Sequence, residues 1–136
     1  MNDKVFLDTN VLVYMHSEDE PEKLGISVQL TRQYRCLTSI QAINEFCNVF
    51  IKKMKKTRQE VDDAVSAIIT SSVTKKVEIE TLRYALTLHE RYGYSYYDCV
   101  MLASALENGC TKIYSEDMSS GQIIEDRLLI LNPYEG

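Results

Sequence analysis

KVFLDTNVL, at residues 4–12, joins a short apolar run to a polar tripeptide and a second apolar segment. The run Val5–Leu7 is typical of a buried strand. Asn10 is a favourable N-cap, so the pattern predicts a helix that starts near Val11. A strand followed at once by a helix, with Asp8 at the junction, is the first unit of an α/β fold.

Short apolar runs and longer helical patterns alternate along the rest of the chain. Further strands are predicted at residues 36–38, 112–114 and 128–131. Helices are predicted from apolar residues at helical spacing: Ile43, Phe46, Cys47, Phe50 and Met54; Ile79, Leu82 and Leu86; and Cys99, Leu102, Ala103 and Leu106. Strands separated by helices favour a parallel sheet that is covered on both faces. The sequence therefore predicts a three-layer α/β/α fold with a short central parallel sheet.

Local signals mark several element boundaries. The acidic stretch 18–22 contains a proline and predicts a loop that leads into a second helix. Residues 57–60 read TRQE, which matches a capping box and should open a helix. Another helix is expected to begin at Ser95 and to stop at residues 108–109, Asn-Gly.

Length and composition indicate one globular domain over residues 1–136. The 136 residues are 45% hydrophobic and 26% charged, with two prolines and five glycines that give no linker. Four cysteines form no C-x-x-C pair, which favours buried, reduced thiols over a zinc site or a disulfide framework. No signal peptide or membrane-length apolar run is visible, so we expect a cytoplasmic protein without a membrane partner.

Acidic side chains fall where ligands bind in open parallel sheets, outside the carboxyl ends of the strands. Asp8 directly follows the first strand, and Asp117 lies three residues after a later one. Asp98 occupies the first turn of a helix, and Glu45 is rotated about 200° from the apolar Ile43. Carboxylates held close together need protons or a cation. Oxygen ligands without thiolate or imidazole suit Mg²⁺ or Mn²⁺.

Each acid also has an ordinary structural interpretation. Asp98 could complete a capping box with Ser95, and Asp8 could belong to an Asx-type turn. Glu45 could be a solvent-exposed helix residue, and Asp117 a loop cap. The functional interpretation rests on the four acids together.

Four strings resemble the acidic motifs of the PIN-domain nucleases: Asp8-Thr9-Asn10, Asn44-Glu45, Ser95-Tyr96-Tyr97-Asp98 and Ser115-Glu116-Asp117. The resemblance extends from Val5 to about Leu131 and is closest to the VapC-like toxins of prokaryotic toxin–antitoxin pairs. It implies an Mg²⁺- or Mn²⁺-dependent endoribonuclease that acts on RNA. It also implies a homodimer that is inhibited by a small cognate antitoxin protein.

The resemblance assigns roles to residues of this chain. Asp8, Glu45, Asp98 and Asp117 would be the catalytic quartet, with Asp8, Asp98 and Asp117 as metal ligands. Asn10, Ser39 and Ser115 would be polar supports of the site. Glu116 is adjacent to Asp117 and could substitute for it, but the family places its acid two residues after the hydroxyl position that Ser115 holds here.

The net charge of −5 gives no global basic field to indicate a nucleic-acid partner, so RNA binding would need a local basic surface. A basic cluster follows the Glu45 helix: Lys52, Lys53, Lys55, Lys56 and Arg58. It is a candidate phosphate-contact strip, and equally a solvated helix end with cations near the negative end of the dipole. Tyr94, Tyr96 and Tyr97 could stack on bases, although core or dimer contacts are the commoner use of tyrosine.

Three other interpretations compete with a nuclease. A phosphatase of the haloacid-dehalogenase type usually has a second aspartate at the position of Asn10. A response-regulator receiver expects a lysine after a late strand, where this chain has residues 115–117, Ser-Glu-Asp. A non-catalytic binding module with a PIN-like fold is disfavoured by the intact set of four acids.

Overall fold

The computed structural model describes residues 3–135, which form six strands and six helices. The strands are β1 (Lys4–Leu7), β2 (Arg35–Ser39), β3 (Val73–Lys75), β4 (Lys112–Tyr114), β5 (Ile123–Ile124) and β6 (Leu128–Leu131). The helices are α1 (Thr9–Tyr14), α2 (Pro21–Gln33), α3 (Ile40–Lys52), α4 (Arg58–Ser71), α5 (Ile79–Tyr92) and α6 (Tyr96–Glu107).

One six-stranded sheet has the order β3-β2-β1-β4-β6-β5. All neighbouring strands are parallel except β5 and β6, which pair antiparallel. The predicted central parallel sheet is therefore confirmed, and β5 adds an antiparallel strand at one edge. The edge strands β3 and β5 were not predicted, because β3 reads Val-Thr-Lys without a buried apolar run and β5 has only two residues.

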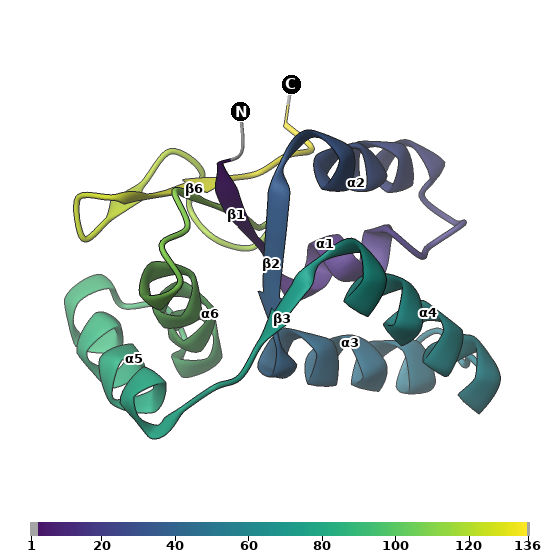
Figure 1. Cartoon of the computed structure of the whole chain (residues 1–136), viewed down its shortest axis with the longest axis horizontal. Helices are drawn as coiled ribbons and strands as arrows, with labels where there is room; N and C mark the ends of the chain where they lie inside the picture. Colours follow the sequence, from purple (N-terminus) through teal and green to yellow (C-terminus); the bar gives the residue numbers. More distant parts are fainter. Residues whose placement is uncertain (1–2, 136) are drawn as a thin grey trace.

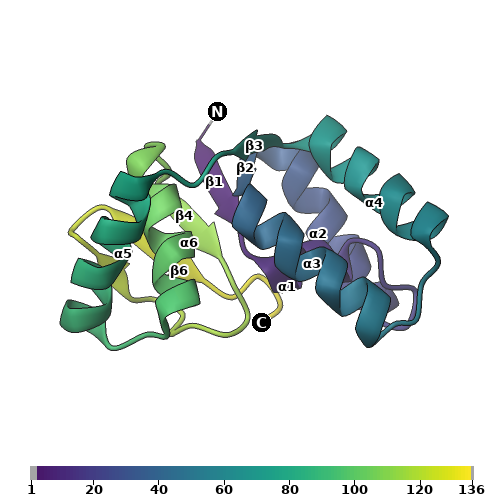
Figure 2. The same ribbon diagram turned by 90° about the horizontal axis from the view of Figure 1, so that it is seen from below.

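Helices lie on both sides of this sheet, which confirms the three-layer α/β/α prediction. Figures 1 and 2 show α5 and α6 on one side, and α1, α2, α3 and α4 on the other. The central strands are apolar because both of their faces are covered. Within α6, residues 99–106 are all buried, so this helix forms the middle of one layer.

Two helix starts differ from the sequence-based prediction. Helix α1 begins at Thr9, and its N-cap is Asp8, whose side chain accepts a hydrogen bond from the Thr9 amide. The predicted N-cap Asn10 is instead inside the helix, where its side chain makes tertiary contacts. Helix α2 begins at Pro21, so part of the predicted acidic loop is helical; proline is favourable there because the first helical amide needs no intrahelical partner.

Other helix signals are confirmed. The capping box of Thr57 and Glu60 opens α4, Ser95 caps α6, and α6 ends at Glu107, directly before Asn108 and Gly109. The apolar pattern of α5 located the helix but gave the wrong face. Its marker residues Ile79, Leu82 and Leu86 are exposed, whereas its buried residues are Thr81, Ala85 and Leu88.

The four cysteines are all free thiols. Cys36, Cys99 and Cys110 are buried, as the sequence predicts, whereas Cys47 is only half-buried. Among residues 3–135, no helix combines the length and the apolar character that a membrane crossing would require.

Matched isoleucine truncations test this sheet. Ile113, in the middle of β4, is 0% exposed, whereas Ile123 in β5 is 58% exposed. We expect Ile113→Val to lower the free energy of unfolding by about 0.5–1.5 kcal/mol, because it removes a buried methylene and leaves a small void. Ile123→Val removes the same group from a solvated position and should stay within about 0.5 kcal/mol of the wild type. Urea denaturation measures the unfolding free energy of both variants. Equal losses of stability would contradict the burial of Ile113 and the exposure of Ile123.

Candidate active site

Asp8 is a buried carboxyl group at the carboxyl end of β1. Its backbone amide continues the sheet by donating to the Tyr114 carbonyl at 3.1 Å. Its Oδ1 accepts from the Thr9 amide at 2.7 Å, and its Oδ2 accepts from the Ser115 hydroxyl at 2.8 Å. Asp8 thus caps α1 while it links the ends of the adjacent strands β1 and β4.

The loop after β4 brings Asp117 to the same edge of the sheet. The Ser115 hydroxyl that donates to Asp8 also accepts a hydrogen bond from the Asp117 amide at 3.2 Å. The Asn10 side-chain amide donates to Asp117 Oδ2 at 2.9 Å, while Asn10 Oδ1 accepts from the Glu116 amide at 3.2 Å. Ser115 and Asn10 therefore hold the loop in place, and Asn10 contacts Asp117 rather than Asp8.

Glu45 reaches the site from α3. Ser39 ends β2 and caps α3 by accepting from the Ala42 amide at 3.2 Å, so the helix starts beside the carboxyl edge. Glu45 Oε1 accepts from the Thr9 hydroxyl at 3.2 Å, and Oε2 accepts from the Gln41 side chain at 2.9 Å. Ser39 thus acts on the site through the helix that it caps.

Asp98 enters from the first turn of α6, on the opposite side of the sheet from α3 (Figure 2). The Asp98 amide donates to the Ser95 hydroxyl at 3.2 Å, so Asp98 contributes its backbone to the cap of α6. That role does not remove the side chain from the site, because Asp98 is half-buried and interacts electrostatically with Asp8, Glu45 and Asp117.

Burial and the neighbouring acids raise the pKa values of Asp8 and Asp98. Burial raises the pKa of Asp8 from its ordinary 3.8 to about 7, and nearby Asp98 and Glu45 add to the rise against the hydrogen bonds that lower it. Burial also raises the pKa of Asp98, with further contributions from Asp117 and Glu45. Four side chains that are distant in sequence therefore share one electrostatic environment.

No cationic side chain neutralises the quartet within residues 3–135, where ion pairs join only Lys23 to Glu116 and Arg91 to Glu125. In the same part of the chain, no three His, Cys, Asp or Glu side chains stand close enough to enclose a metal ion as they are placed. The donor set is nevertheless all carboxylate, and its negative charge is uncompensated. This chemistry fits a hard divalent cation.

Glu116 does not compete with Asp117 for the site. Its carboxylate accepts from Lys23 Nζ at 2.6 Å and from the Tyr14 hydroxyl at 2.7 Å. Those partners lie on α1 and α2, so the ambiguity between the two adjacent acids resolves in favour of Asp117.

Sequence reasoning missed Thr9, Gln41 and Lys23. Gln41 lies four residues before Glu45 on one helix, a spacing that brings side chains together and could have identified it. Thr9 belongs to a recognised motif but carried no signal for contact with α3. The Lys23–Glu116 contact spans 93 residues and has no local signal.

The predicted basic strip lies at the far end of α3. Lys52 ends the helix, Lys53 and Lys55 are exposed, and Lys56 is half-buried. Since a helix rises about 1.5 Å per residue, Lys52 lies roughly 10 Å along the axis from Glu45. Of the three candidate stacking residues, Tyr97 is exposed, whereas Tyr94 and Tyr96 are half-buried and pack against the core.

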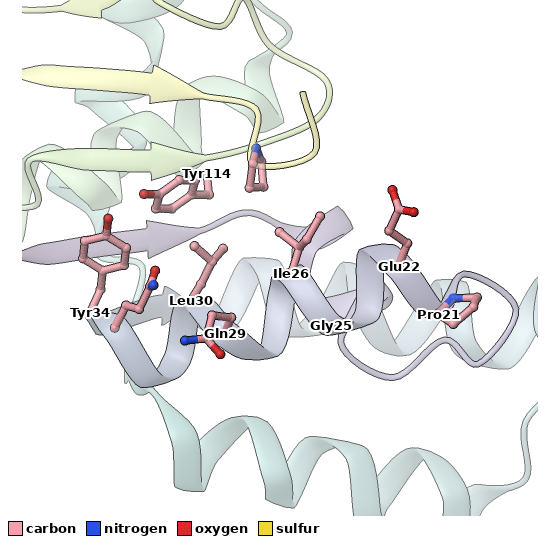
Figure 3. Close-up of a pocket in the computed structure, with 10 residues that line it drawn as sticks. Pro21, Glu22, Gly25, Ile26, Gln29, Leu30, Tyr34 and Tyr114 are labelled. Carbon is pink, nitrogen blue, oxygen red and sulfur yellow. The ribbon is translucent and has the colours of Figure 1, made fainter. Parts of the chain in front are cut away.

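A separate cavity of about 660 Å³ lies between α2 and the ends of β4 and β6 (Figure 3). The residues that line it are Pro21, Glu22, Gly25, Ile26, Gln29, Leu30, Gln33, Tyr34, Tyr114 and Pro133. None of the four acids of the quartet is among them. This cavity is thus distinct from the acidic edge of the sheet.

The fold is an α/β sheet whose acidic side chains gather at the carboxyl ends of its parallel strands, where ligands bind in open sheets. Residues 5–119 match the model of the PIN domain. The chain belongs to the PIN-domain family. This result leaves no place for the haloacid-dehalogenase and receiver interpretations.

Relatives agree with this assignment. The chain is 28% identical over 118 residues to the protein named ribonuclease VapC23 of Mycobacterium tuberculosis, covering 83% of this chain and 92% of that protein. A toxin–antitoxin complex from Klebsiella pneumoniae has a similar structure, with a TM-score of 0.73, 16% identity, and coverage of 96% of this chain and 98% of that one.

VapC20 of M. tuberculosis, a toxin that cleaves the sarcin–ricin loop, is also similar in structure. Its TM-score is 0.67 at 17% identity, and the match covers 83% of this chain and 89% of that one. At such low identities, these two structures show a shared fold only.

The raised pKa of Asp8 predicts a dependence of stability on pH. The folded chain holds this proton more tightly than the unfolded chain, whose Asp8 titrates near 3.8, so folding stability falls as the pH rises from about 4 to about 7. Asp8→Asn keeps one acceptor oxygen and replaces the other with an amide NH₂ that can donate to the Ser115 hydroxyl, and it has no carboxyl proton to lose. In EDTA, the wild type should therefore lose folding stability relative to Asp8→Asn as the pH rises. Urea denaturation of both proteins at pH 4.5 and pH 8 measures this change. An unchanged difference would contradict the raised pKa.

Proposed function

We propose that this chain is a divalent-metal-dependent endoribonuclease of the VapC type, the toxin component of a toxin–antitoxin pair, formed by a single PIN-like domain over residues 1–136. The observation that carries the proposal is the uncompensated acid cluster around buried Asp8. The PIN-domain match and the relative named ribonuclease VapC23 favour RNA as the substrate.

Asp8, Asp98 and Asp117 would hold Mg²⁺ or Mn²⁺; ribonucleases of this family generally depend on a divalent metal. When bound, the metal offsets the charge of the phosphate and makes a water molecule more acidic. Ser115 keeps Asp8 oriented toward the site, and Asn10 does the same for Asp117. These supports reduce the reorganisation that binding requires.

Glu45 would orient the attacking water, because its carboxylate is already held by Thr9 and Gln41. In-line attack forms a new bond between the water oxygen and phosphorus and breaks the bond from phosphorus to the 3′ oxygen. The water loses a proton to a carboxylate of the quartet, and the 3′ oxygen takes one up from solvent. The products are a 5′-phosphate and a 3′-hydroxyl.

A cognate antitoxin is the expected protein partner. The structural relatives include a toxin–antitoxin complex from K. pneumoniae and VapBC2 of Rickettsia felis bound to promoter DNA. An antitoxin arginine or lysine could pair with the carboxylates and block the site. Four free thiols and an RNA substrate are consistent with the cytoplasm. The homodimer stays a prediction.

Asp98→Asn tests the function. Because a catalytic metal contributes several kcal/mol of transition-state stabilisation, we expect the cleavage rate to fall roughly 100-fold or more. Asp62→Asn changes an exposed aspartate on α4 and serves as the control. Cleavage of labelled RNA is followed with Mg²⁺, with Mn²⁺ and with EDTA. Full activity of Asp98→Asn, or full activity in EDTA, would overturn the proposal; binding without cleavage by the wild type would favour a non-catalytic module.

The basic strip is tested by the salt dependence of RNA binding. Each lost phosphate contact should reduce the slope of log affinity against log salt by about 0.7 for single-stranded RNA, so Lys52→Gln with Lys55→Gln should lower it by roughly 1.4. Lys4→Gln with Lys112→Gln removes the same charge at the opposite end of the sheet and should leave the slope unchanged. An equal slope in both double variants would make the strip a solvated helix end.

A further inference from the structure

Glu116 lies between two residues of the site but points away from it. The preceding residue, Ser115, donates to Asp8, and the following residue, Asp117, faces the other three acids of the quartet. The Glu116 carboxylate instead bonds to Lys23 at 2.6 Å and to the Tyr14 hydroxyl at 2.7 Å. The loop is thus anchored in two opposite directions, toward β1 by Ser115 and toward α2 by Glu116.

The position of Lys23 is itself fixed by aromatic residues. Its ammonium lies 4.6 Å from the centre of the Tyr14 ring and 5.4 Å from that of Tyr134, both within cation–π range. The two rings pack edge to face at 5.1 Å. The Ser27 hydroxyl donates to the Lys23 carbonyl at 2.7 Å and is 2.6 Å from the Tyr134 hydroxyl. The ammonium therefore occupies a built position rather than a freely moving surface one.

Asp117 has much weaker restraints of its own. It is exposed, and its described side-chain contact is the hydrogen bond from Asn10. The direction of this carboxylate is therefore set by Asn10 together with the backbone of residues 115–117. If the Glu116 side chain were released, rotation of this short segment could turn either acid toward the site.

We propose that Lys23 is a positioning residue for Asp117: by holding Glu116 against α2, it fixes the loop so that Asp117, and not Glu116, faces the other three acids of the quartet. The inference rests on the proposed function for the role of Asp117. The geometric part, that Lys23 orders residues 115–117, can be tested without RNA or metal.

Hydrogen exchange of the metal-free protein tests the ordering directly. The Glu116 amide donates to Asn10, and the Asp117 amide donates to Ser115, so both report on the loop. In Lys23→Met, we expect both amides to exchange at least about tenfold faster, while amides in the central strand β4 keep their rates. Arg91→Met breaks the other ion pair, with Glu125, and should leave both loop amides unchanged.

Metal affinity then tests the consequence. Titration calorimetry with Mn²⁺ should show roughly tenfold weaker binding by Lys23→Met and by Glu116→Gln, in line with the loss of an outer support of a metal ligand. Because both changes break the same contact, the double variant should bind no more weakly than either single variant. Lys23→Arg should recover part of the affinity. In RNA cleavage assays, the KM of Lys23→Met for RNA should equal that of the wild type, since Lys23 is not proposed to touch the substrate.

The outcomes separate the two proposals. Unchanged exchange in Lys23→Met, or additive losses of Mn²⁺ affinity in the double variant, would overturn the positioning role. If the wild type binds Mn²⁺ and loses affinity as described but cleaves no RNA, the positioning role stands and the proposed function fails. If the wild type binds no Mn²⁺, both the metal site and the link from Lys23 to it fail, whatever the exchange rates show.

Discussion

The hydrogen bond from the Ser115 hydroxyl to the buried Asp8 carboxyl is the interaction on which the rest of this site depends. It joins the ends of two adjacent parallel strands, and the same hydroxyl accepts from the Asp117 amide. Without a partner, a carboxyl group at this depth would be strongly destabilising. One serine therefore shares with the Thr9 amide the task of making the burial of Asp8 tolerable, and it also starts the loop that carries a second acid.

Burial of Asp8 has an electrostatic consequence for the whole edge of the sheet. Burial, with smaller contributions from Asp98 and Glu45, raises the pKa of Asp8, so its own negative charge is disfavoured, yet three further acids are directed toward the same region from α3, α6 and the loop after β4. The two ion pairs in residues 3–135 lie elsewhere, which leaves the charge available to a cation from solution.

Polar contacts around the quartet form two groups that meet at α1. Thr9 reaches across to Glu45 on α3, whereas Asn10 reaches to Asp117 and to the Glu116 amide. Helix α1 has only six residues. With its N-cap, it carries three successive residues of the candidate site, from Asp8 to Asn10. Its position explains why residues 8–10 are polar in a segment that is otherwise apolar.

The sequence by itself determined the alternation of strands and helices and the central strands β1, β2, β4 and β6, and it singled out the four acids as candidate site residues. It did so because hydrophobic periodicity, capping residues and the placement of acids after strands are local properties. Local signals failed where burial depends on partners: the buried face of α5, the short edge strands, and the start of α1 at Thr9 in place of Val11.

Only the tertiary structure decided which of the adjacent acids Glu116 and Asp117 faces the site. Lys23 and Glu116 are 93 residues apart, and Ser115 and Asp8 are 107 residues apart. Contacts at such separations arise from the order of strands in the sheet, which no local pattern encodes. The residue types were therefore readable from the chain, whereas their partners, and with them the direction of each carboxylate, were set by the packing of β1 against β4.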